Sequence, residues 1–233
     1  MLVATSADIH SPQYLEQFFA SLQCAGKIDL LLLAGDLVLK NDFRQLPLLV
    51  ETIRRTYRGP IIACFGNEEY DQDKDKYKEF GEITWLEDEA KIIRTSEGDL
   101  GIVGSRGSLD RPTFWQRKNV AGIWQLYEER LEKIDSLLAT LRTKIKIVLT
   151  HYAPTYETLQ GENESAWPEM ACKKFEEVIA RRQPDVWIHG HAHKGKIPQV
   201  ERGGTLIVNA SFPARGSVVT IELPRKKGLE RFF

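Results

Sequence analysis

The stretch IDLLLLAGD, residues 28–36, decides the fold class of this chain. Its apolar residues follow one another without polar alternation, and the run ends at a glycine and an aspartate. A continuous apolar run of this length is typical of a strand whose two faces are both buried. We therefore expect an α/β protein with a sheet, at least partly parallel, that helices cover on both faces.

Amphipathic segments alternate with further apolar runs on both sides of this strand. We expect a strand over 2–7, a helix over 11–26, a helix over 43–57 and a strand over 59–69. In the first helix, Ser11 suits the cap, and a proline and a glycine take the positions that they favour at the two helix ends. The elements expected after residue 70 are an antiparallel pair over 90–105, a helix over 124–143, a strand over 144–151, a helix near 168–182, a strand over 185–193 and short antiparallel strands over 195–223.

The composition excludes some classes of protein. The chain has 233 residues, enough to bury the core of one large domain, and we expect a single domain over 1–233. No apolar run approaches the roughly 18 residues that cross a bilayer, so we expect no membrane partner. The 32 Lys and Arg residues nearly balance the 33 Asp and Glu residues, which argues against a dedicated nucleic-acid surface. A nucleic-acid substrate is therefore neither supported nor excluded.

The cysteines indicate a reducing compartment. Cys24, Cys64 and Cys172 are odd in number, widely spaced and free of C-x-x-C pairing. The first expected strand begins near residue 1 and leaves no room for a cleavable signal peptide. We therefore expect a cytoplasmic protein.

Metal-ligand side chains follow the expected strands at the point where each strand ends. In open α/β sheets, ligands bind beyond the carboxyl ends of the strands, so we expect these side chains to converge. Three of the five histidines lie within IHGHAH, residues 188–193. The candidate donors are Asp8, His10, Asp36, Asn67, His151, His191 and His193.

The donor types narrow the chemistry. They offer oxygen and nitrogen atoms without thiolate, a set that suits Mn²⁺, Fe or Zn²⁺, and among these we favour Mn²⁺. Seven residues are too many for one tetrahedral ion. With one bridging carboxylate, they give each of two divalent ions about four protein ligands, at the ~3.5 to 4 Å spacing of two-metal hydrolytic sites.

The order of these motifs resembles that of the calcineurin-like metallophosphoesterase family. That family shows D-x-H, G-D, G-N-H-D/E, a lone strand-end H and G-H-x-H in the same order, and the resemblance spans residues 8–193. It implies two facing mixed β-sheets flanked by helices, the four-layer sandwich of metallophosphoesterases. It also implies hydrolysis of a phosphate ester by a hydroxide that bridges two metal ions.

The resemblance assigns roles residue by residue. It implies that the ligands of the first metal ion are Asp8, His10, Asp36 and His193. The implied ligands of the second metal ion are Asp36, Asn67, His151 and His191, so that Asp36 bridges the two ions.

The positions implied to be catalytic are Asn67, Glu68 and His151. Glu68 departs from the family, because it replaces the histidine of G-N-H-D/E that assists the leaving group. Branches that lack this histidine often act on diesters, and the resemblance therefore favours phosphodiesters over phosphomonoesters.

Several of these residues also fit plain structural roles. Asp36 could cap a helix, and Asn67 could occupy a turn with positive φ. Glu68 and Glu69 could be surface carboxylates, the usual place for acids. His189 has no ligand role in the family pattern, and whether it contacts substrate or lies behind the ligands stays open.

The segment 104–119 mixes arginines with aromatic residues. Arg106 and Arg111 are candidates to bind a substrate phosphate, and Phe114 and Trp115 could stack on a base. A loop packed under the helix over 124–143 explains the same composition, and we favour that interpretation.

We interpret the chain as a cytoplasmic, dinuclear, metal-dependent hydrolase of phosphate esters. The competing class is a non-catalytic scaffold that keeps the fold for protein binding. The full set of seven donors favours the enzyme, because a scaffold has no physical need for it.

Overall fold

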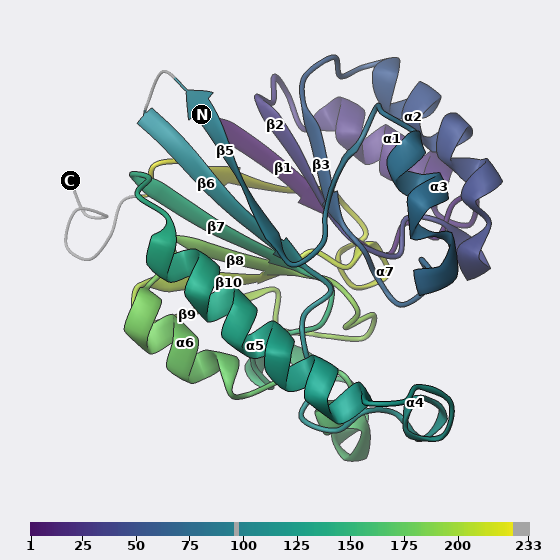
Figure 1. Ribbon diagram of the computed structural model, residues 1–233. Helices are drawn as coiled ribbons and strands as arrows, with labels where there is room; N and C mark the ends of the chain where they lie inside the picture. Colours follow the sequence, from purple (N-terminus) through teal and green to yellow (C-terminus); the bar gives the residue numbers. More distant parts are fainter. Residues whose placement is uncertain (96–97, 226–233) are drawn as a thin grey trace.

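Two β-sheets lie face to face at the centre of the molecule, and helices cover their outer faces (Figure 1). The computed structural model describes residues 1–95 and 98–225. This arrangement confirms the fold class that the sequence predicts.

The first sheet has five strands in the order β11-β1-β2-β3-β4. Strands β1 to β4 run parallel, and β11 pairs antiparallel with β1. The bounds are Val219–Glu222 for β11, Leu2–Ser6 for β1, Leu30–Ala34 for β2, Ile61–Cys64 for β3 and Thr84–Leu86 for β4.

The second sheet has six strands in the order β5-β6-β7-β8-β10-β9. Its four inner strands are parallel, and the two edge strands are antiparallel to their neighbours. The bounds are Glu89–Thr95 for β5, Gly98–Ser105 for β6, Ile145–Thr150 for β7, Val186–His189 for β8, Thr205–Asn209 for β10 and Gln199–Arg202 for β9.

The helices separate into two outer layers (Figure 1). Beside the first sheet lie α1 (Leu15–Cys24), α2 (Leu46–Arg54), α3 (Lys74–Glu79) and the short α7 (Phe212–Arg215). Beside the second lie α5 (Ile123–Thr140) and α6 (Phe175–Arg182), and α4 (Phe114–Asn119) projects beyond them. Short 3-10 helices span Leu39–Asn41, Phe43–Gln45, Asp71–Asp73, Glu157–Leu159 and Glu164–Glu169. No helix in the described ranges combines the length and the apolar character needed to cross a membrane.

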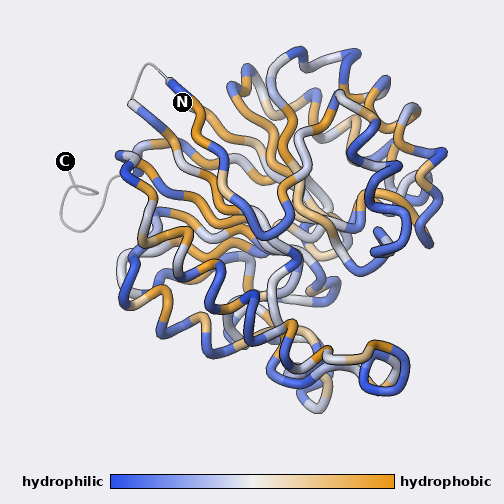
Figure 2. Tube along the Cα trace, viewed as in Figure 1, coloured by the Kyte–Doolittle hydropathy of each residue, from blue (hydrophilic) through white to orange (hydrophobic). Residues whose placement is uncertain are grey.

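Three apolar layers hold the four layers of secondary structure together, and the strands carry most of the apolar colour in Figure 2. Strand β2 shows why its run is wholly apolar. Leu31 and Leu33 pack against the helices, whereas Leu30 and Leu32 pack between the two sheets. Successive side chains of a strand point to opposite faces, so a strand buried on both faces needs apolar residues at every position.

Two expected helices begin later than the sequence indicated. The first begins at Leu15, because Ser11 pairs with Val38 in a β-bridge and does not cap the helix. The helix expected near 168–182 begins at Phe175. The chain just before it pairs with Ala153 through backbone hydrogen bonds, which competes with helix formation.

Two further segments correct the expectations. The strands over 195–223 are not all antiparallel, because β10 pairs parallel with β8. The segment 104–119 is only partly a packed loop: Leu109 is buried beside Tyr127, but Phe114 and Trp115 on α4 are 71% and 65% exposed. The turn of the expected pair over 90–105 includes residues 96–97, which lie outside the described residues.

Candidate metal centre

All seven predicted donors follow the carboxyl ends of strands, and the structure brings them together. Asp8 and His10 follow β1, Asp36 follows β2 and Asn67 follows β3, all on the first sheet. The second sheet supplies His151 after β7 and both His191 and His193 after β8. Parallel strands bring their carboxyl ends to one edge, and the two sheets meet at this edge.

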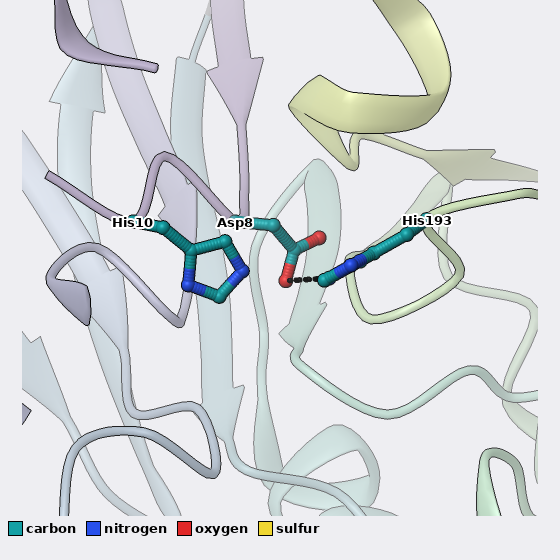
Figure 3. Close-up of side chains that lie close together, drawn as sticks. All are labelled: Asp8, His10 and His193. Carbon is teal, nitrogen blue, oxygen red and sulfur yellow. Dashed lines mark ion pairs between the residues drawn. The ribbon is translucent and has the colours of Figure 1, made fainter. Parts of the chain in front are cut away.

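One group of donors comprises Asp8, His10 and His193, whose ligand atoms lie within 4.8 Å of one another (Figure 3). Oδ1 of Asp8 lies 3.3 Å from Nε2 of His193, and the rings of His10 and His193 meet edge to face. Among the described residues, Asp8 Oδ1, His10 Nδ1 and His193 Nε2 are buried atoms with no hydrogen-bond partner. Buried polar atoms are rarely left so, and a cation between them would satisfy all three.

A second group comprises Asp36, His151 and His191, again with ligand atoms within 4.8 Å of one another. Asn67 joins it, because its Oδ1 lies 2.9 Å from Nε2 of His151. Oδ2 of Asp36 lies 3.5 Å from the same nitrogen. The rings of His151 and His191 meet at 4.9 Å between centroids.

The tautomer of His151 follows from its surroundings. Its Nδ1 lies 2.9 Å from the carbonyl oxygen of Ala34, which can only accept a hydrogen bond, so Nδ1 carries the proton. Complete burial lowers the pKa of His151 and keeps the ring neutral, which leaves Nε2 with a free electron pair. In the orientation that the structure gives Asn67, this nitrogen faces Asn67 Oδ1 and Asp36 Oδ2, and neither oxygen carries a hydrogen when Asp36 is ionised. Such a cluster suits a cation.

The two buried aspartates, Asp8 and Asp36, have very different pKa values. Burial would raise the pKa of Asp8, but the close approach of His193 holds it below its usual range. Burial and the charge of Asp8 raise the pKa of Asp36 to about 7. Two carboxylates in one dry site cannot both ionise cheaply, and a divalent cation removes that penalty.

The backbone of the site is unusual. Asp8, His10, Asp36 and His191 all have positive φ, between 43° and 67°. Left-handed backbone is uncommon outside glycine and concentrates at functional sites. The neighbouring loops also pass very close to one another: a Cβ on Gly66 would lie 2.1 Å from Asp36 Oδ1.

Glu69 belongs to the candidate site, and the alternative that it is a surface carboxylate is wrong. It is completely buried, and its carboxylate accepts hydrogen bonds from the backbone amides of Asp36, Leu37 and Gly66. It therefore ties the loop after β2 to the loop after β3. Burial and the charge of Asp36 raise the pKa of Glu69 to about 7. Its place at the end of G-N-x-E was the only signal in the sequence.

Glu68 is half-buried at the rim of the site. Its Oε2 lies 3.3 Å from His10 Nδ1 and accepts a hydrogen bond from the amide of Lys40 at 2.6 Å. Its own amide donates to Asp36 Oδ1 at 2.7 Å. Burial alone would raise the pKa of Glu68, but His10 and the Lys40 amide lower it, so the carboxylate is ionised.

The plain structural roles do not describe Asp36 and Asn67. The 3-10 helix after β2 begins only at Leu39, with Val38 at its N-cap, so Asp36 caps no helix. Asn67 is not among the residues with positive φ. Instead, the side chains of Asp36 and Asn67 both lie beside Nε2 of His151.

His189 lies behind the ligand groups. It is fully buried; its Nδ1 lies 2.8 Å from the carbonyl oxygen of Gly190 and its Nε2 lies 2.9 Å from the hydroxyl of Thr158. Burial lowers the pKa of His189 to about 4, so the ring is neutral. Both ring nitrogens are engaged within the protein.

The two arginines singled out in the sequence have protein partners. Arg106 is nearly buried, donates to the carbonyl oxygen of Glu69 at 2.7 Å and forms an ion pair with Asp71 at 3.0 Å. Arg111 is exposed and pairs with Glu169 at 3.1 Å. Arg106 thus supports the loop that carries Glu68 and Glu69, and a role for either arginine in substrate binding stays a prediction.

Comparisons with known proteins agree with this geometry. Residues 1–195 match the family described as calcineurin-like phosphoesterase. The phosphopantetheinyl hydrolase from Mycobacterium tuberculosis is similar in structure, with a TM-score of 0.69 at 16% identity over 96% of this chain and 96% of that chain. A purple acid phosphatase from seeds of yellow lupin (Lupinus luteus) has a TM-score of 0.59 at 12% identity, over 97% of this chain and 46% of that chain. No curated protein sequence matches the chain. At these identities the two structures show a shared fold.

Proposed function

Because this chain belongs to the calcineurin-like phosphoesterase family, we propose that it uses two divalent cations, held side by side, to hydrolyse phosphodiesters. The family supports a metal-dependent phosphoester hydrolase in general. The two cations and the preference for diesters are the finer parts of the proposal.

One observation carries the proposal: three buried donor atoms, Asp8 Oδ1, His10 Nδ1 and His193 Nε2, have no hydrogen-bond partner among the described residues, and a second cluster of donors adjoins them. Asp8, His10 and His193 form one cluster, and Asp36 with His151 and His191 forms the other. Hydrogen bonds alone do not account for the first cluster, because its three buried atoms are left unsatisfied. The proposed ligands of the first ion are Asp8, His10, Asp36 and His193, and those of the second are Asp36, Asn67, His151 and His191.

When bound, two such cations polarise a phosphate ester and activate water for in-line attack. The protein's own residues position the donors. Ala34 fixes the tautomer of His151, and Glu69 holds the backbone of Asp36 in place. His189 supports the turn at Gly190 from behind.

The preference for diesters rests on Glu68. Its ionised carboxylate adds a negative charge beside the centre, and a phosphomonoester dianion carries one more negative charge than a diester. An ionised carboxylate also cannot give a proton to the leaving oxygen. Both effects favour diesters with good leaving groups.

Hydrolysis of an aryl phosphodiester and of the matched monoester tests the proposal. Purified protein is stripped with chelator and given Mn²⁺, Zn²⁺ or Fe²⁺, and bound metal is counted by elemental analysis. We expect about two ions per chain, activity that returns with the metal, and faster reaction of the diester. His191→Ala is the matched inactive control. Fewer than one ion per chain together with no hydrolysis of either ester would support the non-catalytic scaffold instead.

The remaining parts of the proposal concern setting and substrate. We propose Mn²⁺ as the native metal and the cytoplasm as the compartment, the latter supported by three cysteines that are all free thiols. The chain is proposed to act as one domain over 1–233. Its substrate is a phosphate ester, and a nucleic acid is one candidate of that class.

A further inference from the structure

Glu68 is held in place at three points, two of them at its carboxylate, although it lies at the rim of the site. Its backbone amide donates to Asp36, its Oε2 accepts from the amide of Lys40, and the same oxygen lies 3.3 Å from Nδ1 of His10. Among the described residues, its second oxygen, Oε1, has no hydrogen-bond partner. A surface carboxylate is seldom held in this way, because exposed Glu side chains keep most of their rotamers.

The Nδ1 atom of His10 faces this carboxylate. The His10 side chain is only 6% exposed, and its Nδ1 is buried without a hydrogen-bond partner among the described residues. One ligand atom each from His10, Asp36 and Glu68 lies within 4.8 Å of the other two. Ligands of one ion at ~2.0 to 2.3 Å lie at most about 4.5 Å apart, so small side-chain movements bring the three onto a common cation.

We propose that Glu68 is itself a ligand of the cation held by His10 and Asp36, adding a third carboxylate to the centre. This assignment rests on the proposed function and deepens it. Two divalent cations with Asp8 and Asp36 carry a net charge of about +2, and Glu68 reduces this to about +1. The weaker positive field disfavours a dianionic phosphomonoester more than a monoanionic diester, so Glu68 sets the substrate class.

Metal titration separates this role from a catalytic one. Apo protein is titrated with Mn²⁺ by isothermal calorimetry, for the wild type, Glu68→Gln, His10→Ala, the double variant that combines these two changes, and the control Glu82→Gln. Gln keeps an oxygen for the Lys40 amide but loses the charge, and thermal unfolding in EDTA checks that each variant is folded. Glu82 is an exposed glutamate, paired with Arg54, on the surface.

We expect Glu68→Gln to weaken one of two Mn²⁺ sites by about 10 to 100-fold and to leave the other unchanged. His10→Ala should weaken the same site, the double variant should lose less than the product of the two effects, and Glu82→Gln should change neither site. At saturating Mn²⁺, the ratio of diester to monoester hydrolysis should fall about tenfold in Glu68→Gln.

Two results overturn the assignment in different ways. Unchanged affinity at both sites in Glu68→Gln, with one site lost in His10→Ala, shows that Glu68 binds no metal and leaves the proposed function intact. Fewer than one Mn²⁺ per wild-type chain overturns the proposed function and this assignment together.

Discussion

Asp36→Asn should stabilise the cation-free protein and abolish its response to metal. Asp36 is 2% exposed, and burial next to Asp8 raises its pKa from 3.8 to about 7. A carboxyl group whose pKa is raised in the folded state favours folding only while it is protonated. The stability that this proton contributes is complete below pH 4 and is lost as pH rises to about 7.

The size of the effect follows from that shift. Three pKa units correspond to about 4 kcal/mol, so ionised Asp36 costs the cation-free protein up to about 4 kcal/mol at pH 8. Asn avoids this cost. Its Oδ1 still accepts from the amide of Glu68, and its Nδ2 can donate to Nε2 of His151, which lies 3.5 Å from Oδ2 of Asp36. Mn²⁺ at 100 times its Kd stabilises the wild type by about 2.7 kcal/mol per site, a gain that the variant should not show.

Differential scanning calorimetry at pH 8 in EDTA and in Mn²⁺ measures both effects. We expect the variant to melt up to about 8 to 16 °C above the wild type in EDTA, and this difference to shrink at pH 5. Asp88→Asn is the control, because the Asp88 carboxylate accepts hydrogen bonds from Ser105 and Arg130 and is not part of the donor clusters. Its loss should cost about 1 to 3 kcal/mol with or without Mn²⁺. A variant that is less stable than wild type in EDTA, and that gains as much from Mn²⁺, would refute the reasoning.

Three further predictions follow from named contacts. His189→Ala should keep about two bound metal ions and lose about 1 to 3 kcal/mol of stability. His191→Ala and His193→Ala should each lose one metal ion. Equal metal loss in all three variants, measured by elemental analysis, would contradict this. Glu69→Gln should lower the free energy of unfolding in urea by about 1 to 3 kcal/mol and weaken Mn²⁺ binding, because the NH₂ group of the new glutamine must face a backbone N–H. An unchanged urea midpoint would count against the role of Glu69 in joining the two loops. In saturating Mn²⁺, the rates of an aryl diester series should depend steeply on phenol acidity, because the ionised carboxylate of Glu68 cannot give a proton to the leaving oxygen. Glu68→Ala should therefore change these rates less than about tenfold. A flat wild-type dependence that becomes steep in the variant would show that Glu68 donates a proton.

The residue pattern determined the fold class and predicted which donor residues lie together. The unbroken leucines of β2 require cover on both faces, and that requirement is visible without any coordinates. Parallel strands end at one edge, so residues that follow them, such as Asp8, Asp36 and His151, were predictable as neighbours. Identity and spacing along the chain carried this information.

Only the tertiary structure decided which acids and histidines serve the site directly. Glu68 and Glu69 are adjacent in sequence, yet one carboxylate faces His10 and the other binds three backbone amides in the interior. His189 and His191 are two residues apart, and only His191 faces the other candidate ligands, because β8 ends at His189 and the backbone of His191 is left-handed. Burial, hydrogen-bond partners and tautomers depend on which loops of the two sheets meet, and contacts between residues so distant along the chain leave no local pattern in it.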